Sequence, residues 1–594
     1  MTTKDIDHSE VRKRFQQYLS QIRERYQTKD FTELSLRTPL ENLITSLNKE
    51  YSVIQEPKRT AGVGAPDFKA FRRNIKVGFI ETKELTRKLD EELKSQQIEK
   101  YSNSIDNLIL TNYIRFILIR ANGSPLDLNL FTMHDLENPR FSIDSARIAE
   151  ALSLIETFFD YNLPTISSAL ELSFELAKKT RLLKILAKNQ LEEDIARIKN
   201  NEVPSTVHDF LDGARELIKD ISVDDCSDAY AQTITYGLFL AKMNCPGDLD
   251  RNSAASYIPH SIAVIKRIFM NISGDSLPSN LSWLIDEIVD VLNASKMNDI
   301  LSEIDTRGKK DRDPFTFFYE NFLSSYDPEK KKHLGVYYTP RPVVSFIINS
   351  VNQVLKSDFG NPNGFADDNV TVLDPAVGTG TFLWLLYTLT LVELKNKNLG
   401  GLIRKKIETH ILHDFYGLEI LITPYIIAHL KLSLALKKWY YDVKGDDRIP
   451  VYLSNTLEPS EIHGLMPFLR EITDESRVAN ELKLKKKILV ITGNPPYHGS
   501  SSNKGEWIDG LLKKGYTRKD GSKDYGYYQI DGKPLGERNP KWLQDDYVKF
   551  IRFAQWKIDT SGEGIVAFIT NNGYIDNPTF RGMRQSLFNS FDRI

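Results

Sequence analysis

The clearest chemical feature of the sequence is the tetrapeptide Asn494-Pro495-Pro496-Tyr497, which directly follows the apolar run 488–492. That run predicts a buried strand, and open α/β sheets build their sites at the carboxyl ends of such strands. Each proline fixes φ and removes a backbone donor. The amide oxygen of Asn494 and the carbonyl of Pro495 can then both accept hydrogen bonds from one amino group, and Tyr497 can stack on a flat ring beside them. Four residues alone are equally compatible with a proline-rich turn.

A glycine-containing segment, Asp374-Pro375-Ala376-Val377-Gly378-Thr379-Gly380-Thr381, follows the strand-like run 370–373 and opens an apolar helical run. Glycines let a backbone approach a ligand closely. The segment lacks the Gly-Lys-Ser/Thr of a phosphate loop, so a plain turn or another kind of nucleotide site are the alternatives. Glu419 ends the next strand-like run, 415–418, where a carboxylate suits the two hydroxyls of a ribose. The alternative for Glu419 is a solvated carboxylate.

A second group of chemical residues lies near the N-terminus, where Pro66-Asp67 is followed by Glu81-Thr82-Lys83. Asp67 begins one predicted strand, 67–71, and Glu81 and Lys83 end the next, 77–83. Alternation along a strand puts Glu81 and Lys83 on the same face. Two carboxylates and a lysine that meet at a hairpin can hold Mg²⁺ and activate water for phosphodiester cleavage. Surface hairpins also carry this pattern by chance.

The elements that must position these residues fall into three predicted domains, 1–135, 136–325 and 326–594. The first alternates helix and strand patterns, with a helix at 11–26, a hairpin across 108–119, and a helix over 39–47 for which Thr38 is the N-cap and Pro39 the first helical residue. The second has apolar residues at spacings of three and four throughout, which predicts a helical connector. The third returns to strand–helix alternation and predicts a doubly wound parallel sheet with strands at 370–373, 415–418, 451–453, 488–492 and 565–570.

The third domain resembles the gamma class of amino-group DNA methyltransferases, which modify adenine N6. The resemblance rests on the order of several motifs: 335–340, 374–380, Glu419, 454–457, 494–497, 546–550 and 564–572. It implies a Rossmann-like fold, S-adenosylmethionine as cofactor, and double-stranded DNA as partner, with the target adenine flipped out of the duplex. It also implies that Asn494 to Tyr497 are catalytic. The cofactor-binding residues that it implies are Tyr338, Thr339, Pro340, Asp374, Ala376, Gly378, Gly380, Glu419, Asn455 and Thr456.

The first domain resembles the PD-(D/E)xK nuclease superfamily. Besides Asp67, Glu81 and Lys83, the run Gln97-Ile98-Glu99-Lys100-Tyr101 resembles the Q-x-x-x-Y element that accompanies that core in restriction enzymes. The resemblance implies a Mg²⁺-dependent endonuclease with Asp67 and Glu81 as metal ligands, and Glu41 as a further candidate. A nuclease, a helical connector and a methyltransferase on one chain resemble the type IIG restriction–modification enzymes.

Composition and charge set the outer limits. The chain has 594 residues, of which 41% are hydrophobic, and a net charge of −2. Binding to DNA therefore depends on local positive charge. The lysine runs 330–333 and 483–487 offer it, although each is also typical of a solvated surface. The two cysteines, Cys226 and Cys245, fit a reducing cytoplasm. The charged start 1–14 predicts no secretory leader, the apolar run 382–392 is too short for a membrane span and predicts a buried helix, and no ATP-binding loop is visible.

Three further expectations concern completeness. The sequence stops after the fifth predicted strand, 564–570, without the two further strands, the second base-stacking aromatic and the target-recognition domain of the resembling family. We therefore expect either a missing C-terminal segment or a second chain, and an unpaired sheet edge. The stretch of about fifty residues between Tyr497 and Asp546 predicts a DNA-contacting loop, with a mobile insertion as the alternative. Rival functions are an adenine methyltransferase with an inactive nuclease domain, methylation of protein glutamine or RNA, and a DNA-binding subunit completed by a partner.

Overall fold

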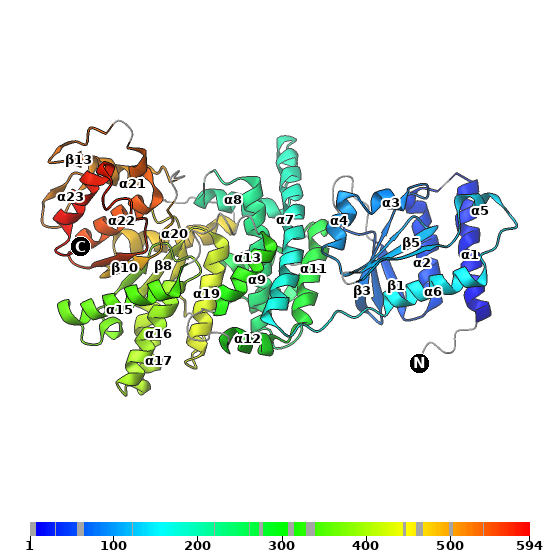
Figure 1. Ribbon diagram of the computed structural model, residues 1–594, viewed down its shortest axis with the longest axis horizontal. Coiled ribbons are helices and arrows are strands. Elements are labelled where there is room, and N and C mark those ends of the chain that lie inside the picture. Colours follow the sequence, from blue (N-terminus) through cyan, green and yellow to red (C-terminus); the bar gives the residue numbers. More distant parts are fainter. Residues whose placement is uncertain are drawn as a thin grey trace. The chain divides into compact units, whose positions relative to one another are not determined.

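The computed structural model describes residues 8–29, 31–55, 65–120, 123–218, 220–259, 262–272, 277–306, 314–327, 339–443, 447–458, 467–497, 503–537 and 540–594. Backbone contacts divide the chain into two compact units, whose elements are labelled in Figure 1. The first comprises Met1–Ile166, Arg181–Asn189 and Ser279–Ser295. The second comprises Ser167–Thr180, Gln190–Pro278 and Lys296–Ile594.

The first unit is an α/β structure around one six-stranded sheet, in the order β1-β2-β3-β4-β5-β6. Only β3 and β4 pair in parallel, because α3 and α4 carry the chain across between them; the other neighbours are antiparallel. The hairpin predicted across 108–119 is confirmed as β4 and β5. The elements are α1 (His8–Gln27), α2 (Glu33–Leu47), β1 (Tyr51–Gln55), β2 (Phe68–Arg72), β3 (Ile75–Thr82), α3 (Leu89–Glu92), α4 (Gln96–Ser102), β4 (Asn107–Thr111), β5 (Arg115–Arg120), β6 (Leu126–Asn129), α5 (Met133–Glu137), α6 (Ser145–Phe159) and α11 (Ser279–Asn293).

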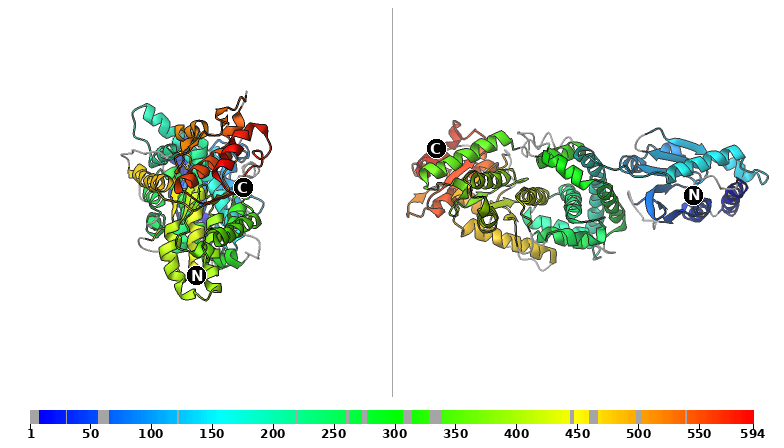
Figure 2. Two further views of the ribbon diagram at one scale, coloured as in Figure 1. Left: turned by 90° about the vertical axis from the view of Figure 1, so that its left-hand side faces the viewer. Right: turned by 90° about the horizontal axis from the view of Figure 1, so that it is seen from below.

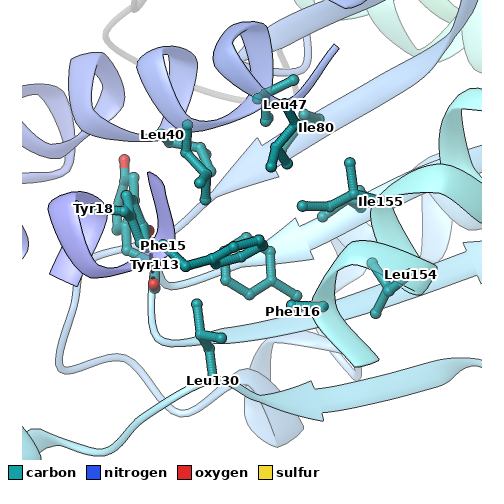
Figure 3. Packing of buried hydrophobic residues seen from close by; sticks show 14 of the residues in the cluster. Phe15, Tyr18, Leu40, Leu47, Ile80, Tyr113, Phe116, Leu130, Leu154 and Ile155 are labelled. Carbon is teal, nitrogen blue, oxygen red and sulfur yellow. Dashed lines mark hydrogen bonds between the residues drawn. The ribbon is translucent and has the colours of Figure 1, made fainter. Parts of the chain in front are cut away.

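The core of the first unit lies where side chains of α1, α2 and α6 meet those of the sheet (Figure 3). Phe15 of α1 and Leu40 of α2 are fully buried there, and Ile155 of α6 is 4% exposed. The buried residues of each helix recur at spacings of three and four, which is the pattern of one apolar face. This packing fixes α2 and the start of β2 against the end of β3, which are the elements that carry the candidate nuclease residues.

The helix predicted over 39–47 begins earlier than expected. The structure has α2 at Glu33–Leu47, with Thr32 as N-cap, and Pro39 lies inside the helix. The side chain of Thr32 accepts a hydrogen bond from the Ser35 amide at 3.3 Å, which ties down the first turn. The prediction that Thr38 is the N-cap is therefore wrong, because burial of Leu36 and Arg37 holds the first two turns helical and outweighs the amide hydrogen that Pro39 lacks.

The second unit begins with a helical block, as the sequence predicts. Its helices are α7 (Ala169–Lys199, of which 181–189 belong to the first unit), α8 (Thr206–Leu217), α9 (Val223–Asn244), η2 (Arg251–Tyr257), α10 (Ala263–Ile272), α12 (Met297–Thr306) and α13 (Pro314–Tyr326). Helix α9 packs against α19, and α8 and α10 pack against α20. The block thus supports two helices that flank the second sheet.

The second sheet has five parallel strands in the order β15-β10-β7-β8-β9, which confirms the predicted parallel sheet. Helices lie on both sides of it (Figure 2). One face packs against α20, α21 and α22, and on the other Gly417 of β8 leaves room for Leu383 of α16. Among the described residues, β15 pairs only with β10. The strands are β7 (Val372–Asp374), β8 (Phe415–Glu419), β9 (Val451–Leu453), β10 (Val490–Gly493) and β15 (Ile565–Phe568).

The remaining helices of the second unit surround this sheet. They are α15 (Arg341–Asp358), η3 (Gly364–Ala366), α16 (Thr381–Asn396), η4 (Gly400–Leu402), α17 (Ile403–Lys406), η5 (Ile407–Ile411), α18 (Leu412–Asp414), α19 (Ile422–Lys437), α20 (Pro467–Leu484), α21 (Glu506–Lys514), η6 (Lys541–Gln544), α22 (Asp546–Ser561), η7 (Pro578–Phe580) and α23 (Arg581–Ser590). Helix α16 is the buried helix predicted at 382–392. No helix in the described part of the chain has the length and apolar character that crossing a membrane needs. Both cysteines are free.

The described part of the long stretch after Tyr497 is folded, so a mobile insertion is the wrong interpretation of it. It contains α21 and two small hairpins, β11 (Tyr516–Thr517) with β12 (Lys523–Asp524) and β13 (Gln529–Ile530) with β14 (Lys533–Pro534). Tyr527 is fully buried in a cluster shared with α22 and α23. Arg552 of α22, itself fully buried, pairs with Asp524 and donates to the Leu511 carbonyl at 2.9 Å. These contacts join the insertion, residues 503–545, to the helices beside it.

Candidate functional site

The carboxyl ends of β7, β8, β9 and β10 surround a cavity of about 140 Å³. Most of the predicted cofactor residues and two of the four predicted catalytic residues meet there, as expected where parallel strands end at one edge of a sheet. The lining residues are Thr339, Asp374, Pro375, Ala376, Val377, Gly378, Thr379, Thr381, Phe382, Leu418, Glu419, Ile420, Leu421, Ser454, Asn455, Thr456, Asn494, Pro496, Asn503 and Phe550.

The glycine-containing segment forms the turn from β7 into α16. Gly380 is the N-cap of α16 with φ 80°, a left-handed conformation that favours glycine. A Cβ there would also lie 3.3 Å from Ala428 of α19, so the helices need glycine to pack this closely. Gly378 has φ 53° and nothing within 4 Å of the position a Cβ would take. The backbone at Gly378 is therefore open to a ligand in the cavity.

Asp374 is a buried carboxyl at the end of β7. Its Oδ1 accepts a hydrogen bond from the Ala376 amide at 3.1 Å, and burial raises its pKa to about 8. A Cβ at position 493 would lie 2.4 Å from that Oδ1, so Gly493 of β10 makes room for the carboxyl. Asp374 therefore shapes the turn from inside the protein.

Glu419 is also buried, with 8% of its surface exposed, so a solvated strand-end carboxylate is the wrong interpretation of it. Its Oε2 accepts from the Gly378 amide at 2.8 Å, and its Oε1 accepts from the amides of Ile420 and Leu421 at 3.0 and 2.9 Å. Burial raises its pKa to about 7 against these bonds. Glu419 joins the glycine turn to the end of β8 and keeps an acidic group on the cavity wall.

Asn494 follows β10 directly and lines the same cavity. Its Nδ2 donates to the Thr339 hydroxyl at 3.2 Å, which fixes which way the amide faces. Its Oδ1 is buried and has no partner among the described residues. Buried acceptors in proteins are normally hydrogen-bonded, because leaving one without a partner costs free energy. A bound ligand with a hydrogen-bond donor would remove that cost. Of the other motif residues, Pro496 lines the cavity, Pro495 is buried, and Tyr497 packs against the cluster of the insertion and α22.

Two of the predicted cofactor residues, Pro340 and Tyr338, are not among the lining residues given above. Pro340 is the N-cap of α15, next to Thr339 on the cavity wall. Tyr338 and the lysine run 330–333 lie outside the described residues. In the second lysine run, 483–487, Lys483 is fully buried. A solvated surface run is therefore the wrong interpretation of that residue. Burial lowers the pKa of Lys483 to about 7.

Asn503 is a cavity residue that sequence reasoning missed. Its Oδ1 accepts from Asn455 Nδ2 at 3.2 Å, and its Nδ2 donates to Asp546 Oδ1 at 3.0 Å. Lys549 of α22 donates to its carbonyl. The residue thus links the wall after β9 to the start of α22. A lone asparagine in a glycine- and lysine-rich stretch carries no periodic or motif signal, so only the contacts identify it.

The predicted nuclease residues meet at one end of the first sheet. Phe68 of β2 pairs with Ile80 of β3, which sets Asp67 beside Glu81. Lys83 Nζ lies 2.8 Å from Glu81 Oε1, so the prediction that they share a face is confirmed. Gln97 of α4 accepts from Lys83 at 3.0 Å and donates to Glu81 at 3.0 Å and to Tyr101 at 3.3 Å. All five predicted residues therefore lie in one hydrogen-bonded cluster or directly beside it.

The carboxyls of this cluster are strongly buried. Glu81 is 4% exposed, and burial together with the nearby charge of Asp67 raises its pKa to about 8. Its Oε2 is buried and has no hydrogen-bond partner among the described residues. Asp67 Oδ2 accepts from the Thr82 amide at 2.7 Å and hydroxyl at 2.6 Å, and its Oδ1 pairs with the buried Arg37. Of the Asp67 and Glu81 carboxyl oxygens, Glu81 Oε2 therefore remains without a hydrogen-bond partner among the described residues.

Glu41, the further candidate metal ligand, takes no part in this cluster. Its carboxylate accepts a hydrogen bond from Gln55 of β1 at 2.5 Å. The charged residues of α2 that face the cluster are instead Arg37, which pairs with Asp67, and Glu33, which pairs with Arg37 at 3.1 Å. In the described parts of the chain, no three His, Cys, Asp or Glu side chains gather as a metal site would need. Asp67 and Glu81 thus form a two-carboxylate arrangement.

The family that matches this chain does so within the second unit. Residues 310–532 match the family model described as N-6 DNA Methylase. Over 227 residues the chain is 27% identical to a protein of Methanocaldococcus jannaschii that is provisionally described as a type II restriction enzyme and methyltransferase; the match covers 30% of this chain and 19% of that protein.

Two solved structures are similar over larger parts of the chain. One is the ATP-dependent Type ISP restriction-modification enzyme LlaBIII bound to DNA, with TM-score 0.51 and 21% identity over 74% of this chain and 27% of that one. The other is the DrdV–DNA complex, with TM-score 0.46 and 22% identity over 99% of this chain and 52% of that one. The chain spans less than two thirds of each of these proteins. Residues 310–532 therefore carry an N-6 DNA methylase domain, in a chain that is similar to restriction–modification enzymes.

Proposed function

We propose that the second unit is a site-specific DNA methyltransferase that uses S-adenosylmethionine to methylate adenine N6. The observation that carries the proposal is the orientation of Asn494. Its amide nitrogen is held by Thr339, and its oxygen is a buried acceptor that has no partner among the described residues, on a residue that lines the cavity. An exocyclic amino group is the kind of donor that would complete it.

The residues present fit the methyl donor. Gly378 leaves open space beside its backbone, Glu419 offers carboxylate oxygens for hydroxyl groups, and Asn455 and Thr456 form the wall beside them. Thr339, Pro340, Asp374, Ala376 and Gly380 shape the rest of this cofactor site, and Tyr338 is proposed for it from the sequence resemblance. When bound, S-adenosylmethionine supplies an electrophilic methyl group.

The residues of the tetrapeptide then have separate tasks. Asn494 Oδ1 and the Pro495 carbonyl accept the two hydrogens of the target amine, which orients its nitrogen lone pair. Pro496 keeps the turn rigid, and Tyr497 stacks on the flipped base. Holding the amine in one orientation supplies much of the rate, because positioning replaces the entropy that a free encounter would lose.

The insertion, residues 503–545, is proposed to contact DNA. Lys513 lies over Tyr528, Lys523 over Tyr525, and Lys541 over Trp542, with ring distances of 5.9, 5.3 and 4.9 Å. Tyr525 and Trp542 are 47% and 45% exposed. Lysines and exposed rings together suit phosphates and unstacked bases.

The test is transfer of tritium from labelled S-adenosylmethionine to unmethylated plasmid DNA. We expect label in N6-methyladenine that Asn494→Ala abolishes and that Lys83→Ala, in the first unit, leaves intact. Label in protein or RNA instead would refute the substrate. If the chain binds the methyl donor but does not turn over, and a second chain restores activity, a DNA-binding subunit completed by a partner becomes the better interpretation.

We propose a second activity, Mg²⁺-dependent DNA cleavage, for the first unit, as in type IIG restriction–modification enzymes. The supporting observation is the cluster of Asp67, Glu81 and Lys83, in which Glu81 has one buried oxygen with no hydrogen-bond partner among the described residues. Asp67 and Glu81 would hold the metal ion, which would supply an activated water when bound. Lys83, which Gln97 orients, would lie beside the attacked phosphate.

Cleavage is tested on supercoiled plasmid with and without Mg²⁺. We expect nicking or linearisation that Lys83→Ala and Glu81→Gln each abolish. The matched control is Lys49→Ala, an exposed lysine of the same unit. Methylation without any cleavage in the unsubstituted protein would instead favour an adenine methyltransferase with an inactive nuclease domain.

A further inference from the structure

Lys483, at the end of α20, is a fully buried lysine with three hydrogen-bond acceptors around its ammonium group. Nζ donates to the carbonyls of Asn455 and Glu458 at 2.9 and 3.0 Å, and to the Ser454 hydroxyl at 3.1 Å. A buried ammonium costs free energy unless its hydrogens are all bonded, and here three acceptors match three donors. All three belong to the short segment Ser454–Glu458.

That segment is the wall of the cofactor cavity after β9. Ser454, Asn455 and Thr456 line the cavity. The Ser454 amide donates to the Glu419 carbonyl at 2.7 Å, and the Thr456 hydroxyl donates to the Pro375 carbonyl at 2.5 Å. The segment thus touches both acidic strand ends of the site. Lys483 contacts it from behind and lines no part of the cavity itself.

We propose that Lys483 is a positioning residue for cofactor binding: its ammonium group holds the segment Ser454–Glu458 in the shape that receives the methyl donor. This rests on the proposed methyltransferase function. Without the ammonium, the Glu458 carbonyl would lose this donor and the Asn455 carbonyl would keep only the Glu458 amide at 3.4 Å, so the segment would tend to turn both toward other donors. Such a movement would displace Asn455 and Thr456 at the wall.

The proposed role should depend on pH, because it requires the charged form of Lys483. Burial lowers its pKa to about 7, while Glu458 favours the charged form. A neutral amine keeps only two donors, so Ser454 must then donate its hydroxyl hydrogen to Nζ and cannot donate it into the cavity. Lys557 of α22 also contacts this end of α20, where its Nζ donates to the carbonyls of Leu482 and Lys483 at 3.0 and 2.7 Å. Burial lowers the pKa of Lys557 to about 8.

Lys557 supplies the matched control, because it is also buried and bonds to backbone carbonyls but does not touch Ser454–Glu458. We would compare Lys483→Met with Lys557→Met by calorimetric binding of S-adenosylhomocysteine between pH 6 and 8.5. We expect Lys483→Met to weaken binding about 5- to 30-fold, the effect of one or two hydrogen bonds, and Lys557→Met to weaken it less than threefold. In methyl transfer, Lys483→Met should raise KM for the donor and leave kcat within about threefold.

Two further readouts separate positioning from stability. Wild-type affinity should fall relative to that of Lys483→Met as pH rises through about 7. Hydrogen exchange without any ligand should quicken at residues 454–458 in Lys483→Met but not in Lys557→Met. Equal donor affinity in the two variants, with equal loss of thermal stability, would overturn the inference. Failure of the wild-type chain to bind the methyl donor would instead overturn the proposed function.

Discussion

Replacing Asn494 by alanine removes one amide from the cavity wall, together with its hydrogen bond to Thr339. In the structure the Asn494 nitrogen is already bonded to Thr339 at 3.2 Å, while the oxygen is buried and has no partner among the described residues. The substitution should therefore relieve the free protein of an unsatisfied acceptor. Folding stability should be unchanged or slightly higher, and the loss should fall on the reaction.

The size of that loss follows from the acceptor's surroundings. The oxygen, itself buried, would accept a hydrogen from the target amine as positive charge develops on the nitrogen. Removing one oriented hydrogen-bonding group of this kind typically costs about 10²- to 10³-fold in kcat, or ~2.7 to 4 kcal/mol. Glu419, which is proposed to bind hydroxyl groups of the donor, ends β8, and β7 separates that strand from β10, which Asn494 follows, so affinity for the methyl donor should change less than about threefold.

A second substitution tests the orientation argument separately. Thr339→Val keeps Asn494 but removes the hydroxyl that fixes its amide, so the amide can also present its nitrogen to the cavity. We expect a loss in kcat of about tenfold, the effect of one hydrogen bond to a partly charged group. The assay is single-turnover transfer of tritium to DNA at saturating donor, with Asn349→Ala, an exposed asparagine of α15, as control. Full-rate transfer by Asn494→Ala would refute the assigned role.

Three other outcomes are expected. Burial raises the pKa of Asp374 from 3.8 to about 8, so the folded chain keeps a proton that the unfolded chain releases; the free energy of unfolding should fall as pH rises from about 4 to 8, and Asp374→Asn should flatten this slope in urea titrations at pH 5.5 and 7.5. Gly493→Ala would set a Cβ 2.4 Å from Asp374 Oδ1, and calorimetry should find a loss of about 1 to 3 kcal/mol, whereas an unchanged Tm would contradict that packing. Arg552→Met leaves the buried Asp524 with Arg518 as its remaining cation, which should cost about 1.5 to 3 kcal/mol and open residues 503–545 to limited proteolysis; an unchanged digestion pattern would show that other contacts hold the insertion.

The cavity at the second sheet could be largely predicted from sequence because its residues sit at fixed points of a regular pattern. A parallel sheet brings the ends of its strands to one edge, so Asp374, Glu419 and Asn494 had to lie near each other once their strands were identified. The alternation of strands and helices in the sequence does not show whether a side chain at the end of a strand is buried. The sequence leaves a solvated carboxylate open as an alternative for Glu419, yet three backbone amides hold it inside the protein.

Contacts between segments distant in sequence were not predictable in the same way. Lys483 sits in a run of lysines that is typical of a surface, and only the carbonyls of Asn455 and Glu458 reveal why it is buried. The insertion is rich in glycine and lysine and lacks regular periodicity, but buried contacts hold it, among them the pairing of Asp524 with Arg552 and Arg518. Such pairs are set by tertiary packing, and local patterns carry no trace of them.

The cluster proposed as a nuclease site is the opposite case, in which the residues were predicted but their ionic state was not. Glu81 has a pKa raised to about 8, so near neutral pH it largely keeps a proton, and Asp67 already pairs with Arg37. A divalent cation requires both carboxylates ionised, so its binding must release a proton from Glu81 and compete with Arg37. Affinity for the metal ion should therefore rise with pH through about 8. Arg37→Gln should strengthen binding, because it removes the competing charge beside Asp67 and leaves a neutral side chain in its place.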